Sequence, residues 1–302
     1  MCRYWRESIT SAPENWTLIS TDNIELAKLS LERAKAARVD VSIDMDLFGR
    51  AAPGFPGLVT PCSNSIDTLR VYNLLGWEGL NAAVPNFPRS TPNLQSLTLL
   101  CAYTSAKWDP SIDPFESVPP SLKRLTLFNV PLYPSLRNLR ALTDLTLHYH
   151  RFDLSLDTLL DFLERNRSLE SATLDIRFTG PILRNSQRQE PIRNQLRHLS
   201  ISCNNSVNAQ VLISKIALRE GAHLEISSLD QNTGLNDVLS GVPVTHLSNL
   251  SSPTYMEYHS YPRVIQLYGL NGTFSFSCSP SLATPFVEFP LLSLTAIRQF
   301  HL

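Results

Sequence analysis

The chain has 302 residues and almost balanced charge, since 26 lysine and arginine residues face 27 aspartate and glutamate residues and leave a net charge of −1. This balance excludes the positive field that non-specific binding to nucleic acids or anionic membranes requires. The sequence also lacks an apolar secretory leader and any run of roughly 18 apolar residues, so we expect an intracellular protein, cytoplasmic or nuclear, with no membrane partner.

The first 50 residues predict a small helical cap. Residues 25–37 are rich in strong helix formers, and Asp22 is suited to cap the first turn. Residues 39–43 then alternate apolar and polar side chains, which is typical of a half-buried strand. Residues 51–65 are rich in proline, glycine and serine and predict a loop that leads out of this cap.

An apolar-x-x-apolar-x-apolar frame recurs six times after this loop. Its apolar positions are Ile66/Leu69/Val71, Leu94/Leu97/Leu99, Leu122/Leu125/Leu127, Leu142/Leu145/Leu147, Leu169/Ala172/Leu174 and Leu196/Leu199/Ile201. The first positions of successive frames lie 28, 28, 20, 27 and 27 residues apart, within the period of about 20–29 residues of leucine-rich repeats. Stacked repeats bury their apolar sides against their neighbours. We therefore predict an α/β fold in which residues 51–302 form an irregular leucine-rich-repeat solenoid.

The segments between the frames predict helices or loops on the outer face of a parallel sheet. Residues 156–165 and 206–219 carry apolar side chains at helical spacing, so each fits a crossover between parallel strands. The asparagine expected at the ninth position of a regular repeat occurs once, as Asn204, which predicts irregular curvature.

The frame weakens towards the C-terminus. Leu224 and Ile226 fit a seventh strand, whereas Leu247 with Leu250 and the segments 264–270 and 291–297 fit progressively less well. We expect the solenoid to be poorly defined after about residue 230.

The residues between the frame positions must lie on the other side of the sheet, because side chains alternate along a strand. From them we select a candidate partner-binding face: Arg70, Tyr72, Leu100, Arg124, Phe128, Asp144, His148, Asp175 and His198. Tyr72, Leu100 and Phe128 would form an apolar anchor, with charged residues beside it selecting the partner. The alternative interpretation is structural, because aromatic and threonine residues are favoured in any strand.

Two ion pairs are expected across neighbouring strands of this face. Parallel strands lie about 4.8 Å apart, so Arg124 can pair with Asp144, and His148 can pair with Asp175.

Motifs of enzyme chemistry are absent from the sequence. It contains no phosphate-binding glycine loop, nucleophile elbow or zinc-protease motif, so we expect neither catalysis nor a cofactor. Five cysteines, Cys2, Cys62, Cys101, Cys203 and Cys278, lie far apart and are expected to be reduced. His148 and His150 with Asp175 form the one group that resembles a metal site, which leaves a metal-dependent hydrolase as a remote alternative. Closed zinc sites need four ligands, so a hydrogen-bonded surface pair is favoured.

The N-terminal residues carry a resemblance to a known family. The segment 2–6, with Cys2, Trp5 and Arg6, and the later Pro13 and Trp16 resemble the closing half of the F-box in fungal F-box proteins with leucine-rich repeats. The segments 26–37, 39–43 and 91–99 look like the middle and repeat regions of that family.

This resemblance implies substrate recognition for an SCF-type ubiquitin ligase. In that family the F-box docks on Skp1, which links the repeats to a cullin, and the repeats hold the protein that is to be modified. The opening half of the F-box does not appear in this sequence. The alternative is therefore a stand-alone leucine-rich-repeat scaffold, or an F-box remnant that does not bind Skp1.

Overall fold

The computed structural model has an α/β fold with open, mainly parallel sheets, as predicted. It describes residues 2, 7–8, 10–44, 59–74, 91–101, 119–149, 155–176, 191–193, 195–203, 206–219, 221–228, 253–260, 263–269, 272–278 and 299–301. The chain divides into two compact units, an N-terminal unit (Met1–Leu142) and a C-terminal unit (Thr143–Leu302). The domain boundary predicted between residues 50 and 51 differs from this division after Leu142 and stays a prediction. None of the described helices has the length and apolarity needed to cross a bilayer.

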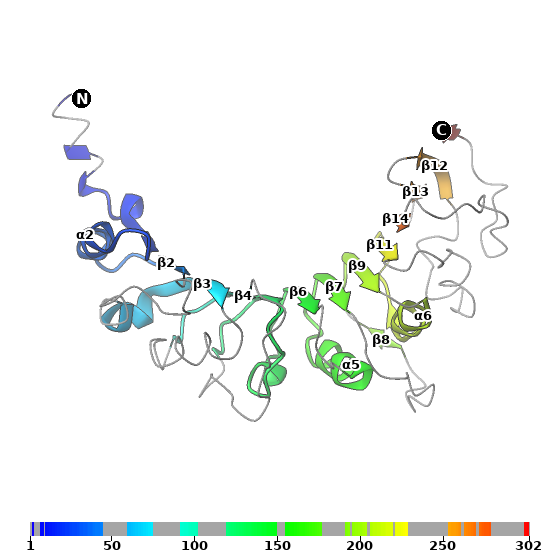
Figure 1. The fold of residues 1–302 in the computed structure, drawn as a ribbon, viewed down its shortest axis with the longest axis horizontal. Coiled ribbons are helices and arrows are strands. Elements are labelled where there is room, and N and C mark those ends of the chain that lie inside the picture. The colour runs from blue at the N-terminus through cyan, green and yellow to red at the C-terminus, as the bar shows by residue number, and fades with distance from the viewer. Residues whose placement is uncertain are drawn as a thin grey trace. The chain divides into compact units, whose positions relative to one another are not determined.

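The described residues of the N-terminal unit form five parallel strands in the order of the chain. Its elements are η1 (Pro13–Trp16), β1 (Leu18–Ser20), α2 (Ile24–Ala34), β2 (Val39–Asp44), η2 (Thr60–Ser65), β3 (Ile66–Leu74), β4 (Ser96–Cys101), β5 (Arg124–Phe128) and η4 (Leu136–Asn138). The predicted strand at residues 39–43 is confirmed as β2. Figure 1 shows α2 beside β2 at the start of this sheet, and α2 also contacts β1 and η1.

Helix α2 begins and ends differently from the prediction. Its N-cap is Asn23 and not Asp22, because the Asn23 side chain accepts a hydrogen bond from the Leu26 amide at 2.9 Å. The carboxylate of Asp22 instead accepts from the Ser20 hydroxyl at 2.8 Å. The helix stops at Ala34 because Lys35 takes a φ of 53°, which lies outside the helical region.

The frame residues of the N-terminal unit stack in register. Leu69, Leu97 and Leu125 are partners on β3, β4 and β5, and Val71, Leu99 and Leu127 form a second column beside them. All nine frame residues of this unit up to Leu127 are at most 3 % exposed. The predicted frame is therefore the buried side of this sheet.

Polar side chains join successive turns of the N-terminal unit. The Ser121 hydroxyl donates to the carbonyl oxygens of Pro92 at 2.6 Å and of Leu94 at 3.0 Å. Asn129 is buried with a φ of 52°, and its amide donates to the Cys101 carbonyl at 3.4 Å. Asn129 stands at the eighth repeat position, one place before the position at which a regular repeat was expected to carry its asparagine.

The C-terminal unit also begins with parallel strands, and its later strands include antiparallel pairs. Its elements are β6 (Asp144–Tyr149), α5 (Leu156–Arg165), β7 (Ser171–Ile176), β8 (Ile192–Arg193), β9 (His198–Cys203), α6 (Ser206–Lys215), β10 (Ile216–Ala217), β11 (His223–Ser228), β12 (Pro253–Ser260), β13 (Arg263–Gly269), β14 (Gly272–Cys278) and β15 (Gln299–His301). The sheet order is β6-β7-β9-β11-β14-β13-β12-β15.

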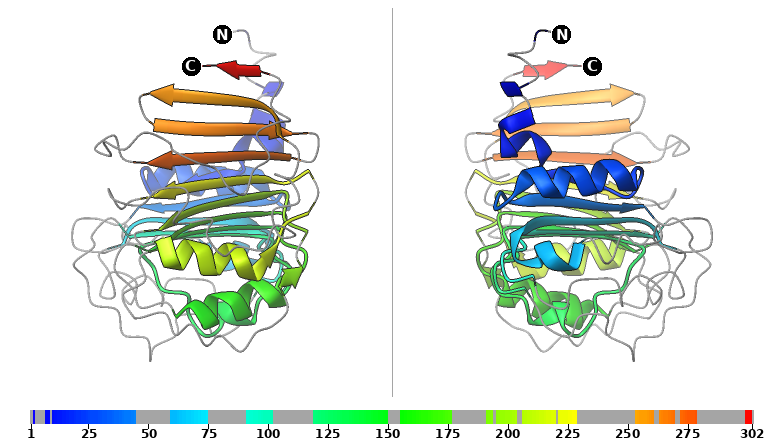
Figure 2. Two further views of the ribbon diagram at one scale, coloured as in Figure 1. Left: turned by 90° about the vertical axis from the view of Figure 1, so that its right-hand side faces the viewer. Right: turned by 90° about the vertical axis from the view of Figure 1, so that its left-hand side faces the viewer.

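The first five strands of this order are parallel. Leu145, Ala172, Leu199, Leu224 and Phe274 form one buried column across them, which confirms the seventh strand predicted at Leu224 and Ile226. The segment 264–270 instead falls largely on β13, which runs antiparallel to both β12 and β14. Figure 2 shows these three strands side by side. The weak frames at residues 247–250 and 291–297 lie outside the described residues.

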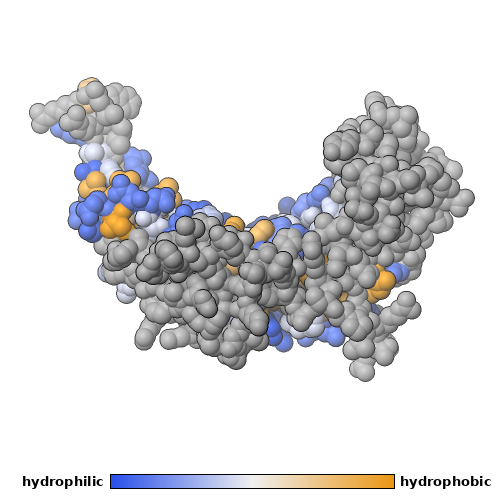
Figure 3. Space-filling model, viewed as in Figure 1, coloured by the Kyte–Doolittle hydropathy of each residue, from blue (hydrophilic) through white to orange (hydrophobic). Residues whose placement is uncertain are grey.

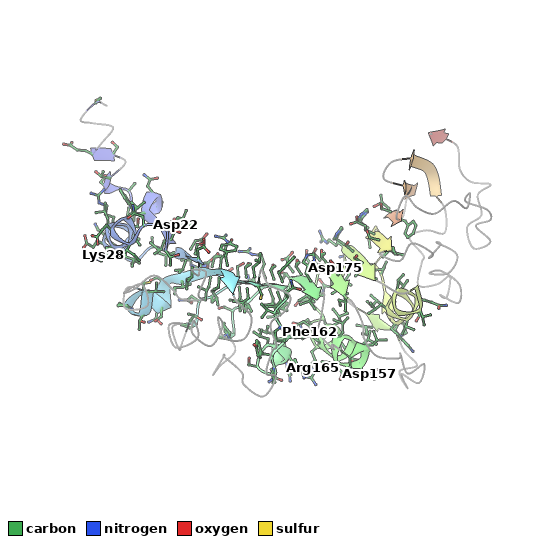
Figure 4. All side chains as sticks on the ribbon, viewed as in Figure 1. Asp22, Lys28, Asp157, Phe162, Arg165 and Asp175 are labelled. Carbon is green, nitrogen blue, oxygen red and sulfur yellow. The ribbon has the colours of Figure 1, made fainter. Side chains whose placement is uncertain are left out.

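Helices α5 and α6 lie on one side of the strands β6, β7, β9 and β11 (Figure 1). α5 has the predicted bounds, and its N-cap Ser155 accepts a hydrogen bond from the Thr158 amide at 3.1 Å. Figure 4 places Phe162 between α5 and the sheet, with Asp157 and Arg165 on the outer side of the helix. The predicted helix over residues 206–219 ends earlier, at Lys215, because residues 216–217 form β10 and pair with β8.

We predict that the buried column controls stability. Leu147→Ala removes a fully buried side chain and should lower the free energy of unfolding by about 2–5 kcal/mol, measured by urea denaturation. Thr146→Ala is the matched control, since Thr146 is the neighbouring residue on the opposite, half-exposed face and should change this energy by less than about 1 kcal/mol. Equal losses in the two variants would contradict the assignment of the faces.

Candidate functional site

Each unit presents one sheet face that its own frame residues do not occupy. On this face the side chains are mainly polar, aromatic or charged and most are half-buried, in contrast to the frame residues. The predicted binding residues lie on this side of their strands, five in the N-terminal unit and four in the C-terminal unit.

The apolar anchor predicted in the N-terminal unit is only partly assembled. Leu100 and Phe128 are register partners on β4 and β5. Tyr72 pairs with Asp44 on β2, but a register shift after Val71 breaks its alignment with Leu100 on β4. Leu100 and Phe128 are therefore aligned as predicted, whereas β3 pairs irregularly with β4 at Tyr72 and the place of Tyr72 in the anchor stays a prediction.

The N-terminal face also carries Asp40, a charged residue that was not among the predicted binding residues. Arg70 lies 3.8 Å from the carboxylate of Asp40 on β2, and the two side chains are 36 % and 42 % exposed. At such exposure an ion pair contributes little. Alternation along β2 could have identified Asp40, since it precedes the buried Val41 as Thr68 precedes Leu69.

The expected pair of Arg124 and Asp144 joins residues of different units and stays a prediction. Within its own unit Arg124 is exposed and is the register partner of Ser96. Asp144 is also exposed, and its carboxylate accepts a hydrogen bond from the Thr143 hydroxyl at 2.7 Å.

The expected pair of His148 and Asp175 is confirmed. The two residues are register partners on β6 and β7, and the His148 Nδ1 lies 3.2 Å from an Asp175 carboxylate oxygen. Both side chains are mostly covered, with 29 % and 17 % of their surfaces exposed. Figure 4 shows Asp175 on the side of the sheet away from α5. The pair thus belongs to the predicted face.

A pair of stacked histidines lies on the same face. His198 on β9 is the register partner of His223 on β11, and their rings stack with centroids 5.0 Å apart and planes 10° apart. The Nδ1 of His223 also forms a hydrogen bond with the hydroxyl of Thr273 on β14. His198 is among the residues predicted from the sequence and His223 is not, although each histidine directly precedes the first buried residue of its strand.

The structure gives no support to a three-ligand metal site within the part of the chain that it describes. No three histidine, cysteine, aspartate or glutamate side chains come together among those residues. His150, the second histidine of the predicted group, lies outside them. Cys2, Cys62 and Cys101 form no disulfide with described residues, and burial raises the pKa of the Cys62 thiol.

The predicted F-box tail is described only in part. Cys2 is exposed, Pro13 begins η1 and Trp16 ends it, whereas Trp5 and Arg6 lie outside the described residues. The guanidinium carbon of Arg33 on α2 lies 4.3 Å from the Trp16 ring centroid, in a cation–π contact. This contact joins η1 to α2.

Two large apolar side chains are exposed close to this contact in the chain. Leu18 on β1 is 63 % exposed and Leu26 on α2 is 51 % exposed. Figure 3 shows hydrophobic patches among hydrophilic ones in the region of α2. Single exposed leucines are common on protein surfaces and by themselves identify no partner.

Comparison of the chain with protein-family models, with curated proteins and with solved structures found no match in any of the three.

We predict that the His148–Asp175 pair is modestly stabilising. A double-mutant cycle with His148→Ala and Asp175→Ala should give a coupling energy of up to about 1 kcal/mol in urea unfolding, since the pair is covered but not fully buried. A cycle with His148→Ala and Ser227→Ala, on a strand that is not adjacent to β6, should give no coupling. Additive effects in the first cycle would contradict the predicted stabilisation by the pair.

Proposed function

We propose that this chain is a non-catalytic protein-interaction module built as an irregular leucine-rich-repeat solenoid. The observation that carries the proposal is the division of each strand: frame residues form buried columns, while the alternate residues line a half-exposed face in each unit. Such a division repeats one surface from strand to strand, which suits recognition of an extended partner.

The repeat intervals support the leucine-rich-repeat assignment. Consecutive frames return at spacings within the leucine-rich-repeat range, and consecutive frames within each unit lie on neighbouring parallel strands. Asn129, Ser121 and Asn93 add hydrogen bonds between turns, with the Asn93 amide donating to the Asn64 carbonyl at 2.6 Å. These bonds satisfy backbone carbonyl groups that a stack of repeats leaves at its turns.

The partner-binding residues of the proposal are those of the two half-exposed faces. In the N-terminal unit the adjacent Leu100 and Phe128 supply apolar contact area, with the exposed Arg124 on the same strand as Phe128. In the C-terminal unit His148 and Asp175 supply polar contacts. Interfaces commonly combine an apolar centre with a polar rim in this way.

The proposed role of the module is substrate recognition for an SCF-type ubiquitin ligase. It is supported by the resemblance of the tail residues, from Cys2 to Trp16, to the end of an F-box. In this role the tail contributes to the contact with Skp1, and the repeat faces bind the protein that is modified. A stand-alone scaffold without Skp1 is the alternative.

We predict that Skp1 co-purifies with the chain, or with a version extended at its N-terminus. Trp16→Ala should weaken this interaction at least about fivefold, because it removes an aromatic contact and the support that Arg33 gives to η1. The dissociation constants are measurable by biolayer interferometry.

Phe128→Ser is the control for this experiment, since Phe128 lies on β5, at the far end of the N-terminal unit's strand order from β1, and should leave Skp1 binding unchanged. If neither version of the chain retains Skp1, the ligase role is wrong and the stand-alone scaffold replaces it.

A further inference from the structure

The stacked histidines join three neighbouring strands of the C-terminal unit. In the row that crosses the sheet here, Ser171, His198, His223 and Thr273 are consecutive register partners on β7, β9, β11 and β14. The ring separation of 5.0 Å matches the spacing of parallel strands, so the stack fits the sheet without displacing either backbone. The bond to Thr273 fixes the second ring from its other side.

Among the residues that the structure describes, few charged side chains lie around the pair. Glu225 faces the same side two residues along β11, and Asp144 lies two strands away in the row of His198. Ser171 and Thr273, which flank the two rings, are uncharged. Arg197 next to His198 has a partner of its own, since its guanidinium lies 3.9 Å from the Glu170 carboxylate.

We propose that the His198–His223 stack is a proton-responsive element of the C-terminal unit. The rings pack face to face while at most one of them is cationic, and uptake of a second proton separates them. Two imidazolium rings at this separation repel each other, and Glu225 is the one described carboxylate on the strands of the pair that faces them. The element does not depend on the identity of the protein partner.

The electrostatics of His223 support this element. Burial, and secondarily the neighbouring His198, lower the pKa of His223 from its ordinary 6.5, while Glu225 acts in the opposite direction. The unfolded chain therefore binds more protons than the folded chain as the pH falls through 6.5. The contribution of the neutral His223 to stability is fully present above this pH and decreases as the pH falls towards the lower pKa of the folded state.

Proton uptake by the histidine pair weakens one end of the pairing between β11 and β14. Among the described parallel strands β14 pairs with β11 alone, and the row of His223 and Thr273 is the first of their five register pairs. Separation of the rings removes support from this end of the ladder, whereas Phe274 on the opposite face remains buried. The effect is thus local to the end of the β11–β14 pair.

The test monitors the histidine rings and the stability of the full chain between about pH 8 and about pH 5.5, where carboxylates stay ionised. In NMR titrations His198→Gln should raise the pKa of His223, because the variant removes a neighbouring positive charge, and Glu225→Gln should lower it further. The free energy of unfolding in urea should fall with decreasing pH in the wild type, and this fall should be smaller in His198→Gln, where only the part of the His223 pKa shift that burial causes remains.

Ser171→Ala is the matched control, since it changes the same row next to His198 without removing a titratable group. It should keep the pH dependence of the wild type. His223→Gln tests the pair from its second ring and serves if His198→Gln does not fold. An unchanged titration of His223 in His198→Gln, together with a pH dependence equal to that of the wild type, would overturn the proposal.

Discussion

The register of the buried columns is the constraint on which both units depend. Side chains alternate between the faces of a strand, so a slip by one residue would move every leucine of that strand to the exposed face and every threonine to the core. Leu99 and Leu174, which are fully buried, show the register that results in each unit. The geometry of the exposed face is therefore set by the packing of the buried columns.

Hydrogen bonds at the turns complement this packing. Asn166 is the C-cap that follows α5, where its amide donates to the Phe162 carbonyl at 2.9 Å, and its complete burial would make an unpaired amide costly. Ser121 and Asn129 perform a similar task at the turns of the N-terminal unit. Polar residues that composition alone would assign to loops are thus structural parts of the stack.

Features set by periodicity were predictable from the sequence, whereas features set by local geometry were not. The frame from Ile66 to Ile201 and the helix α5 were identifiable because apolar spacing is set by burial, and every frame residue is buried. The cap of α2 at Asn23 and the irregular pairing of β3 with β4 at Tyr72 depend on local backbone angles. The sequence does not show which of the adjacent Asp22 and Asn23 caps the helix, or where the regular pairing of β3 ends. His223 was identifiable by alternation, but the antiparallel β13 was not, because a short apolar run fits either strand direction.

The place of β14 has a consequence for how the C-terminal unit assembles. β14 pairs with β11 only after the chain has passed through β12 and β13, so this pairing closes a longer loop than the contacts between β6, β7 and β9. Closure of long loops carries a larger entropy penalty and slows the formation of the pairs that require it. We infer that β6, β7 and β9 pair first, and that the antiparallel strands β12, β13 and β14 join the sheet after them.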